Sequence, residues 1–197
     1  MACGLLFSAG KDSSLAALLL ERFYDVTLVT AHFGTTDDWR HARDAAAELG
    51  FEFETLELDS AVAEEAVERM RDEGFPRPGI QQVHEAALEA AAAEYDVVAD
   101  GTRRDDRVPT VSRAFAQSLE DRHGIEYVAP LSGFGRGAVD DLVETYLEVE
   151  QGPSETVPKG DYEAELRALI RERWGAGAID DIFPDHEQTR VRGRADG

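Results

Sequence analysis

The stretch SAGKDSS, residues 8–14, gathers three hydroxyls, a glycine, a lysine and an aspartate. It follows an apolar run and precedes a helical pattern, so it connects a strand to a helix. The first N–H groups of a helix are unpaired and its amino end is positive, which favours an anion. Gly10 permits close backbone approach and Lys11 supplies charge. A helix cap at Asp12 or Ser13 would explain one residue but not the stretch, so the sequence predicts a phosphate-binding loop.

Two common phosphate loops do not match this spacing. A Walker A loop needs GxxxxGK[ST], but five residues separate Gly4 from Gly10, and Asp12 stands where Ser or Thr is required. A Rossmann GxGxxG is absent. The pattern SxGxDS, from Ser8 to Ser13, resembles the SGGxDS signature of the PP-loop ATPases, also called N-type ATP pyrophosphatases or adenine nucleotide alpha hydrolase-like proteins. Ala9 replaces the second glycine, and a positive φ there would strain the loop.

A second landmark of this resemblance lies in VVADGTRRDDRVPT, residues 97–110. In doubly wound sheets the ligand crevice lies at the carboxyl ends of the strands that flank the reversal of strand order. The strand order of the family, 3-2-1-4-5, implies that the loops after the first and fourth strands are neighbours. Gly101, Thr102, Asp105 and Asp106 would then face the first loop, where carboxylates beside phosphate suit Mg²⁺. Acidic pairs recur along the chain, so an exposed acidic turn is the alternative for Asp105 and Asp106.

The resemblance implies site residues for two cofactors, ATP and Mg²⁺. The catalytic candidates are Lys11, Asp12 and Asp105, and the metal-binding candidates are Asp12, Asp105 and Asp106. The nucleotide-binding candidates are Ser8, Ala9, Gly10, Lys11, Asp12, Ser13, Ser14, His32, Phe33, Gly101, Thr102 and Arg103. His32 and Phe33 end the second strand, where this family holds adenine and ribose, although His32 is equally well explained as a packed residue. Arg103, Arg104 and Arg107 would neutralise leaving pyrophosphate or balance local acids.

Several further residues have less specific patterns. The segment from Ala129 to Leu142 resembles the one after the last strand of related enzymes, with Ala129 in place of an arginine and Arg136 available for its role. The histidines His84, His123 and His186 show no metal-binding spacing, and we interpret them as structural or exposed. Cys3, the single cysteine, opens the first strand far from the loop and is interpreted as a buried small residue rather than a reactive thiol.

Apolar runs alternate with helical patterns along the chain. Strands are expected at 3–7, 25–33, 51–58, 96–100 and 125–131. Helices are expected after residue 10 and over 37–50, 61–74, 80–95, 110–124 and 138–150. Ser60 is expected to cap the third of these helices, and residues 75–79 are expected to separate it from the fourth. This alternation predicts an α/β fold with a doubly wound, parallel, five-stranded sheet, and the resemblance implies the HUP/PP-loop type with order 3-2-1-4-5.

The pattern changes near residue 150. We expect a linker at 152–160, a helix at 161–175 and a loop or tail at 183–197. The predicted organisation is therefore a PP-loop ATP-binding domain over 1–150, followed by a C-terminal helix and tail over 151–197.

Composition restricts the class of protein. Acidic residues number 41 against 20 Lys and Arg, for a net charge of −21, and 43% of residues are hydrophobic. An acidic, lysine-poor but apolar-rich chain is typical of a halophilic archaeon, where salt screens self-repulsion. No apolar run reaches membrane-spanning length and no signal peptide is evident, which predicts a cytoplasmic protein without a membrane partner.

The resemblance implies an enzyme that cleaves ATP between the α- and β-phosphates. AMP passes to a carbonyl or carboxylate oxygen, and a nucleophile then displaces it in amidation or nucleoside modification. The second substrate stays open among a small carboxylate, tRNA and a protein side chain, and a homodimer is also left open. The alternative is a non-catalytic regulatory module similar to universal stress proteins. Those carry a glycine-rich loop after the fourth strand, where this chain has one glycine and two aspartates.

Overall fold

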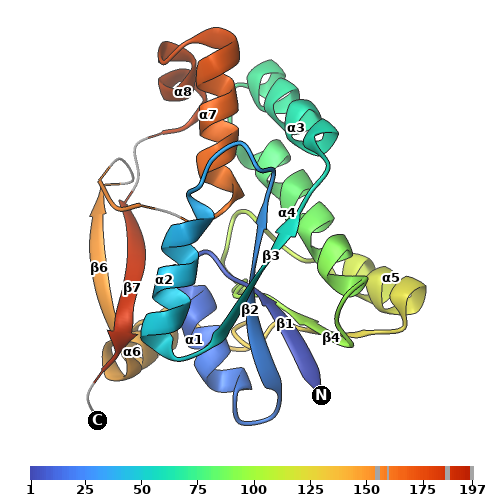
Figure 1. Cartoon of the computed structure of the whole chain (residues 1–197), viewed down its shortest axis with the longest axis vertical. Helices are drawn as coiled ribbons and strands as arrows, with labels where there is room; N and C mark the ends of the chain where they lie inside the picture. Colours follow the sequence, from blue (N-terminus) through green and yellow to red (C-terminus); the bar gives the residue numbers. More distant parts are fainter. Residues whose placement is uncertain (154–155, 159, 185–186, 196–197) are drawn as a thin grey trace.

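A computed structural model describes residues 1–153, 156–158, 160–184 and 187–195. Parts of the expected linker and tail, and His186, lie outside these residues. The main sheet is parallel and has the order β3-β2-β1-β4-β5, which confirms the predicted topology (Figure 1). Its strands are β1 (Ala2–Leu6), β2 (Asp25–His32), β3 (Glu52–Glu57), β4 (Val97–Ala99) and β5 (Glu126–Val128).

Six helices connect or follow these strands. They are α1 (Lys11–Leu20), α2 (Trp39–Leu49), α3 (Ser60–Glu73), α4 (Arg77–Ala92), α5 (Arg113–His123) and α6 (Arg136–Tyr146). The cap of α3 is Asp59, whose carboxylate accepts from Ala61 N at 2.9 Å, rather than the predicted Ser60. Helix α4 begins inside the expected break at 75–79, because a proline in the first helical turn needs no N–H donor there.

Hydrophobic side chains cover both faces of the sheet. Alternate residues of the central strand β1 point to opposite sides, so Cys3 and Leu5 join one core cluster and Leu6 joins the other. The first cluster packs against α1, α2 and α6, and the second against α3 and α4. No helix in the described part of the chain is long and apolar enough to cross a membrane.

The C-terminal segment differs from the predicted helix and tail. It contains β6 (Leu147–Pro153), α7 (Tyr162–Trp174), α8 (Gly177–Ile182) and β7 (Glu187–Arg194), and β6 pairs with β7 in an antiparallel sheet. The helix predicted over 138–150 therefore ends at Tyr146, and the region expected to be a loop or tail holds a strand. The boundary predicted at residue 150 falls within β6.

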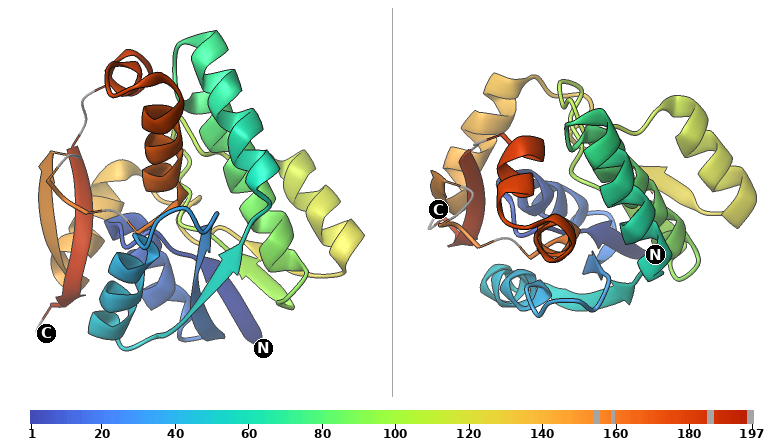
Figure 2. Two further views of the ribbon diagram at one scale, coloured as in Figure 1. Left: turned by 45° about the horizontal axis from the view of Figure 1, so that its top comes forward. Right: turned by 90° about the horizontal axis from the view of Figure 1, so that it is seen from above.

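The hairpin packs onto the main domain. Leu147 and Val191 belong to the same buried cluster as β1 and α1. An isolated two-stranded hairpin is marginal in water, so this packing explains why the strands form. Figure 2 shows the hairpin beside α1 and α2, with α7 between it and the α3–α4 pair.

Candidate functional site

The predicted phosphate loop lies between β1 and α1. Ala9 has a φ of +63°, so the position where related loops carry glycine adopts a left-handed conformation, and the alanine is strained. Val191 N donates to Ala9 O at 2.9 Å, and Ala9 is buried. Strand β7 therefore holds the loop in its strained form.

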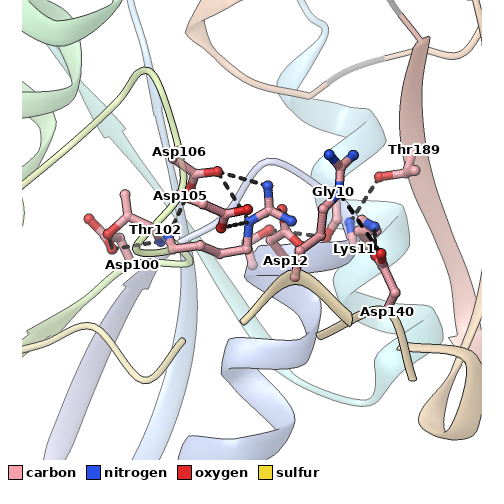
Figure 3. Close-up of polar contacts among 12 residues, drawn as sticks. Gly10, Lys11, Asp12, Asp100, Thr102, Asp105, Asp106, Asp140 and Thr189 are labelled. Carbon is pink, nitrogen blue, oxygen red and sulfur yellow. Dashed lines mark hydrogen bonds and ion pairs between the residues drawn. The ribbon is translucent and has the colours of Figure 1, made fainter. Parts of the chain in front are cut away.

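The hydroxyls of the loop hold its backbone together. Ser14 Oγ donates to Gly10 O at 2.8 Å, and Ser13 Oγ donates to the same oxygen at 3.2 Å. Ser8 Oγ accepts from Gly10 N at 3.4 Å. Lys11 N donates to Thr189 Oγ1 of β7 at 3.2 Å, and Lys11 Nζ contacts Asp140 Oδ1 of α6 at 2.5 Å. The C-terminal hairpin thus reaches the amino end of α1 (Figure 3).

The loop after β4 contacts the phosphate loop, as the strand order predicts. A Cβ atom on Gly101 would lie 2.7 Å from Ser13 N, so only glycine allows this approach. Arg103 comes two residues after Gly101 in the same loop. Its guanidinium bonds the carboxylate of Asp106 at 2.9 Å and lies 3.7 Å from the carboxylates of Asp12 and Asp105. Asp106 also accepts from Arg103 N at 2.7 Å. The structure therefore brings the two landmarks together around one guanidinium (Figure 3).

The charges of this cluster influence one another. Burial raises the pKa of Asp12 above its ordinary value, although Arg103 and Lys11 oppose the effect. Burial alone would lower the pKa of Arg103, but Asp12 and Asp106 outweigh it and raise that pKa. Asp12 Oδ1 is buried and has no hydrogen-bond partner among the described residues. This oxygen has unused capacity for a cation or a donor.

Of the three carboxylates predicted to bind Mg²⁺, Asp12 has a buried oxygen without a partner among the described residues. Among the described residues, no group of three metal-ligating side chains converges on a point. Asp105 and Asp106 face Arg103, whereas Asp12 keeps one unpartnered oxygen. Because Mg²⁺ commonly binds through one or two carboxylates and substrate phosphates, Asp12 with a nucleotide would suffice. The metal-binding roles of Asp12, Asp105 and Asp106 stay predictions.

A cavity of about 280 Å³ opens beside the two landmarks. Its size is close to the lower limit of small-molecule sites and suits a nucleoside, with phosphates outside on the loop. The apolar part of the lining comes from the ends of β1 and β2 and from the loop after β4, and it contains Leu6, Phe7, Val29, Ala31, Val108 and Pro109. The rest of the lining includes Ser8, Asp12, Ser13, His84, Asp100, Gly101, Thr102 and Tyr162.

A buried polar chain in this cavity was not predicted from the sequence. His84 Nε2 bonds Asp100 Oδ2 at 2.8 Å, and His84 Nδ1 lies 3.2 Å from the hydroxyl of Tyr162. His84 is 5% exposed and Asp100 1%. His84 has no motif around it, and Tyr162 comes from the C-terminal segment. The one available signal was that Asp100 ends the predicted fourth strand and so had to lie at the ligand edge of the sheet.

The end of β2 is occupied by a side chain of α7. Glu165, 3% exposed, accepts from Phe33 N at 2.6 Å and from Thr35 N at 2.8 Å. The backbone amide of Phe33, one of the predicted nucleotide-binding residues, therefore already bonds this carboxylate. His32 Nδ1 is buried without a partner among the described residues, and its ring lies 6.3 Å from Trp39. Nucleotide roles for His32 and Phe33 stay predictions.

The remaining sequence candidates lie outside the cavity lining. Arg136 is exposed and lies 4.0 Å from Asp140, beside the lysine that contacts the same carboxylate. Cys3 is fully buried at the opposite end of β1, and burial raises the pKa of its thiol to about 12. A thiol with such a pKa is a poor nucleophile at neutral pH, in agreement with its interpretation as a packed residue.

The structure defines an α/β protein with a five-stranded parallel sheet of the order 3-2-1-4-5 and a cavity at the carboxyl ends of its strands. The chain belongs to the family of unknown function DUF7411, whose pattern matches residues 1–193.

Two comparisons concern Methanocaldococcus jannaschii. The chain is 42% identical over 190 residues to the uncharacterized protein MJ0690, covering 96% of this chain and 94% of that protein. A crystal structure described as a predicted subunit of tRNA methyltransferase is 40% identical and superposes with a TM-score of 0.90, over 100% of this chain and 98% of the other. The U34-tRNA thiolase NcsA from Methanococcus maripaludis is more distant, with 14% identity, a TM-score of 0.46, and coverage of 92% and 70%.

Proposed function

We propose that the protein binds ATP and transfers AMP to a carbonyl or carboxylate oxygen of a second substrate, releasing pyrophosphate. The observation that carries the proposal is the junction of the two landmarks. The hydroxyl-rich loop at the start of α1 and the Arg103 cluster lie side by side, and a nucleoside-sized cavity opens beside them.

The residues of the junction suit the parts of a nucleotide. The amino end of α1 and the serine hydroxyls suit the phosphates, because backbone N–H groups and the helix dipole favour an anion. Arg103, which lies 3.7 Å from Asp12 of the first loop, would compensate the charge that develops on the leaving pyrophosphate. Asp12, with its unpartnered oxygen, would hold Mg²⁺, which shields the phosphates when bound.

The second substrate is proposed to be tRNA. The relative with a TM-score of 0.90 is described as a predicted subunit of tRNA methyltransferase, which supports a role beside RNA. The protein would then activate a nucleoside carbonyl, either alone or as a subunit of a modifying complex.

Turnover of ATP tests this function. Purified protein is incubated with ATP, Mg²⁺ and molar KCl, with and without archaeal tRNA, and AMP and pyrophosphate are quantified. We expect tRNA-dependent release of both products, abolished in Asp12→Asn. The matched control Asp37→Asn removes the same charge from an exposed acid and should keep turnover. Binding of ATP without turnover under every condition would instead indicate a regulatory module, and no binding at all would overturn the proposal.

A further inference from the structure

The Tyr162–His84–Asp100 chain is not required by the phosphate chemistry, yet it lines the same cavity. Three separate elements supply it: α4, the end of β4 and the start of α7. Such a chain fixes the direction of each hydrogen bond. The direction at its last member, the hydroxyl of Tyr162, decides which chemical groups the cavity accepts.

Asp100 sets the direction because it only accepts. Thr102 donates to Oδ1 from N at 2.9 Å and from Oγ1 at 2.6 Å, while Tyr127 donates to Oδ2 at 3.1 Å. Burial alone would raise the pKa of Asp100, but the bonds from His84 and Thr102 outweigh it and lower that pKa. The carboxylate is therefore ionised, and the hydrogen between it and His84 resides on Nε2.

The same logic assigns the hydrogen of Tyr162. With the ring hydrogen on Nε2, directed at the carboxylate of Asp100, Nδ1 serves as the acceptor, and the hydroxyl of Tyr162 donates to it. Burial raises the pKa of Tyr162 well above its ordinary value, so this phenol keeps its proton. Because its hydrogen is donated to Nδ1 of His84, the hydroxyl oxygen of Tyr162 can only accept a further hydrogen bond.

We propose that Tyr162 selects the base of the bound nucleotide by accepting a hydrogen bond from an exocyclic amino group. This inference rests on the proposed function, because it requires phosphates on the loop at residues 8–13 and the nucleoside in the cavity. Adenine carries an amino group at position 6 and satisfies the acceptor. Hypoxanthine carries an oxygen there, and two facing acceptors repel each other.

The comparison of ATP with ITP isolates this contact, because the two nucleotides differ at position 6 and in the hydrogen on the adjacent ring nitrogen. Dissociation constants for both are measured by calorimetry in molar KCl with Mg²⁺. We expect wild-type protein to prefer ATP by at least about tenfold, the effect of one buried polar mismatch. In Tyr162→Phe the preference should fall to within about twofold, since the ring is kept and the acceptor is lost.

Asp100→Asn gives the sharper result. An amide nitrogen facing His84 would donate to Nε2, move the ring hydrogen to Nδ1 and turn Tyr162 into a donor toward the cavity. The order of affinities should then reverse in favour of ITP. The matched control is Tyr127→Phe, which removes another phenol from the same carboxylate but does not line the cavity and should keep the wild-type ratio.

Each outcome decides between the two proposals. Wild-type protein that binds neither nucleotide overturns the proposed function and this inference together. Wild-type discrimination that survives in Tyr162→Phe, or an equal loss of affinity for both nucleotides, shows that the hydroxyl does not select the base and overturns this inference alone. If Asp100→Asn does not fold, ¹⁵N NMR of wild-type His84 replaces it, and a hydrogen on Nδ1 would overturn the assignment.

Discussion

Two regions of the molecule meet at the cavity and are built on different principles. The main domain offers its loops at the carboxyl ends of parallel strands, and neighbouring strands bring them together. The C-terminal segment, residues 147–194, contributes single side chains from a hairpin and a helix: Thr189 at the phosphate loop, Tyr162 in the cavity and Glu165 at the end of β2. The first region supplies the loops of the site through its sheet topology, and the second adds individual side chains through tertiary packing.

The comparison implies that the two regions fold as one unit. The C-terminal contacts replace water at backbone groups of the main domain, and the hairpin shares a buried cluster with β1. A segment that closes a site in this way cannot detach without exposing the strained phosphate loop. The predictions that follow test this unity, beginning with the largest effect.

The largest expected effect is loss of the whole fold at low salt. A net charge of −21 makes the compact state repel itself when the charges are unscreened. The chain has two tryptophans, Trp39 in α2 and Trp174 at the end of α7, one in each region. Fluorescence of Trp39→Phe and Trp174→Phe should show coincident unfolding as KCl is lowered. Separate transitions would show that the regions are independent, and stability indifferent to salt would contradict the halophilic interpretation.

The second prediction concerns Glu165 of α7, whose carboxylate accepts hydrogen bonds from backbone amides just after β2. Glu165→Ala leaves the amides of Phe33, Thr35 and Thr36 without their buried acceptor. We expect the free energy of unfolding to fall by about 3 kcal/mol, measured by denaturant titration in molar KCl.

A matched control for Glu165→Ala lies on the same helix. Glu172 is exposed, so Glu172→Ala should change the free energy of unfolding by less than about 0.5 kcal/mol. Equal effects of the two substitutions would show that α7 contributes general charge rather than a specific acceptor.

The two regions also differ in how far the sequence reveals them. The strand order and the adjacency of the two landmarks followed from SxGxDS, from alternating apolar runs and from the resemblance. The hairpin did not, because Val143 and Leu147 continue the apolar spacing of α6 and hide the start of β6. Strand β7 buries Gln188 and Arg190, so its polar sequence looks like an exposed tail.

The site shows the same limit. Local signals predicted the position of the loop at residues 8–14, because a strand, a loop and a helix follow one another in adjacent residues. They also predicted that Gly101 lies beside that loop. His84 and Tyr162 are 78 positions apart, and nothing local marks either of them. The tie between Glu165 and the end of β2 likewise depends on where α7 docks. Side chains that meet through tertiary packing carry no short motif.

The third prediction tests the contact between β7 and α1. Thr189→Val keeps the shape of the side chain and removes the oxygen that accepts from Lys11 N. We expect a loss of about 1 kcal/mol in unfolding free energy, because this N–H is partly buried and loses one neutral bond. Thr145→Val, on an exposed turn of α6, serves as the control and should cost less. A larger loss for the control would mean that the hairpin contact adds little to the loop.

The smallest effect is expected where three terms nearly cancel, at Ala9. Glycine would relieve a left-handed conformation that costs an L-residue about 1–2 kcal/mol. Glycine would also lose more conformational entropy on folding, which lowers the free energy of unfolding by about 0.5–1 kcal/mol. Removal of the buried methyl group lowers it by about a further 0.8 kcal/mol. The net change in unfolding free energy for Ala9→Gly should therefore lie within about 0.5 kcal/mol of zero. Ala9→Val adds a branched side chain at the same φ and should lose about 2 kcal/mol. Denaturant titration of both variants checks the balance, and a clear gain for glycine would show that relief of the strain exceeds the combined entropy and methyl contributions.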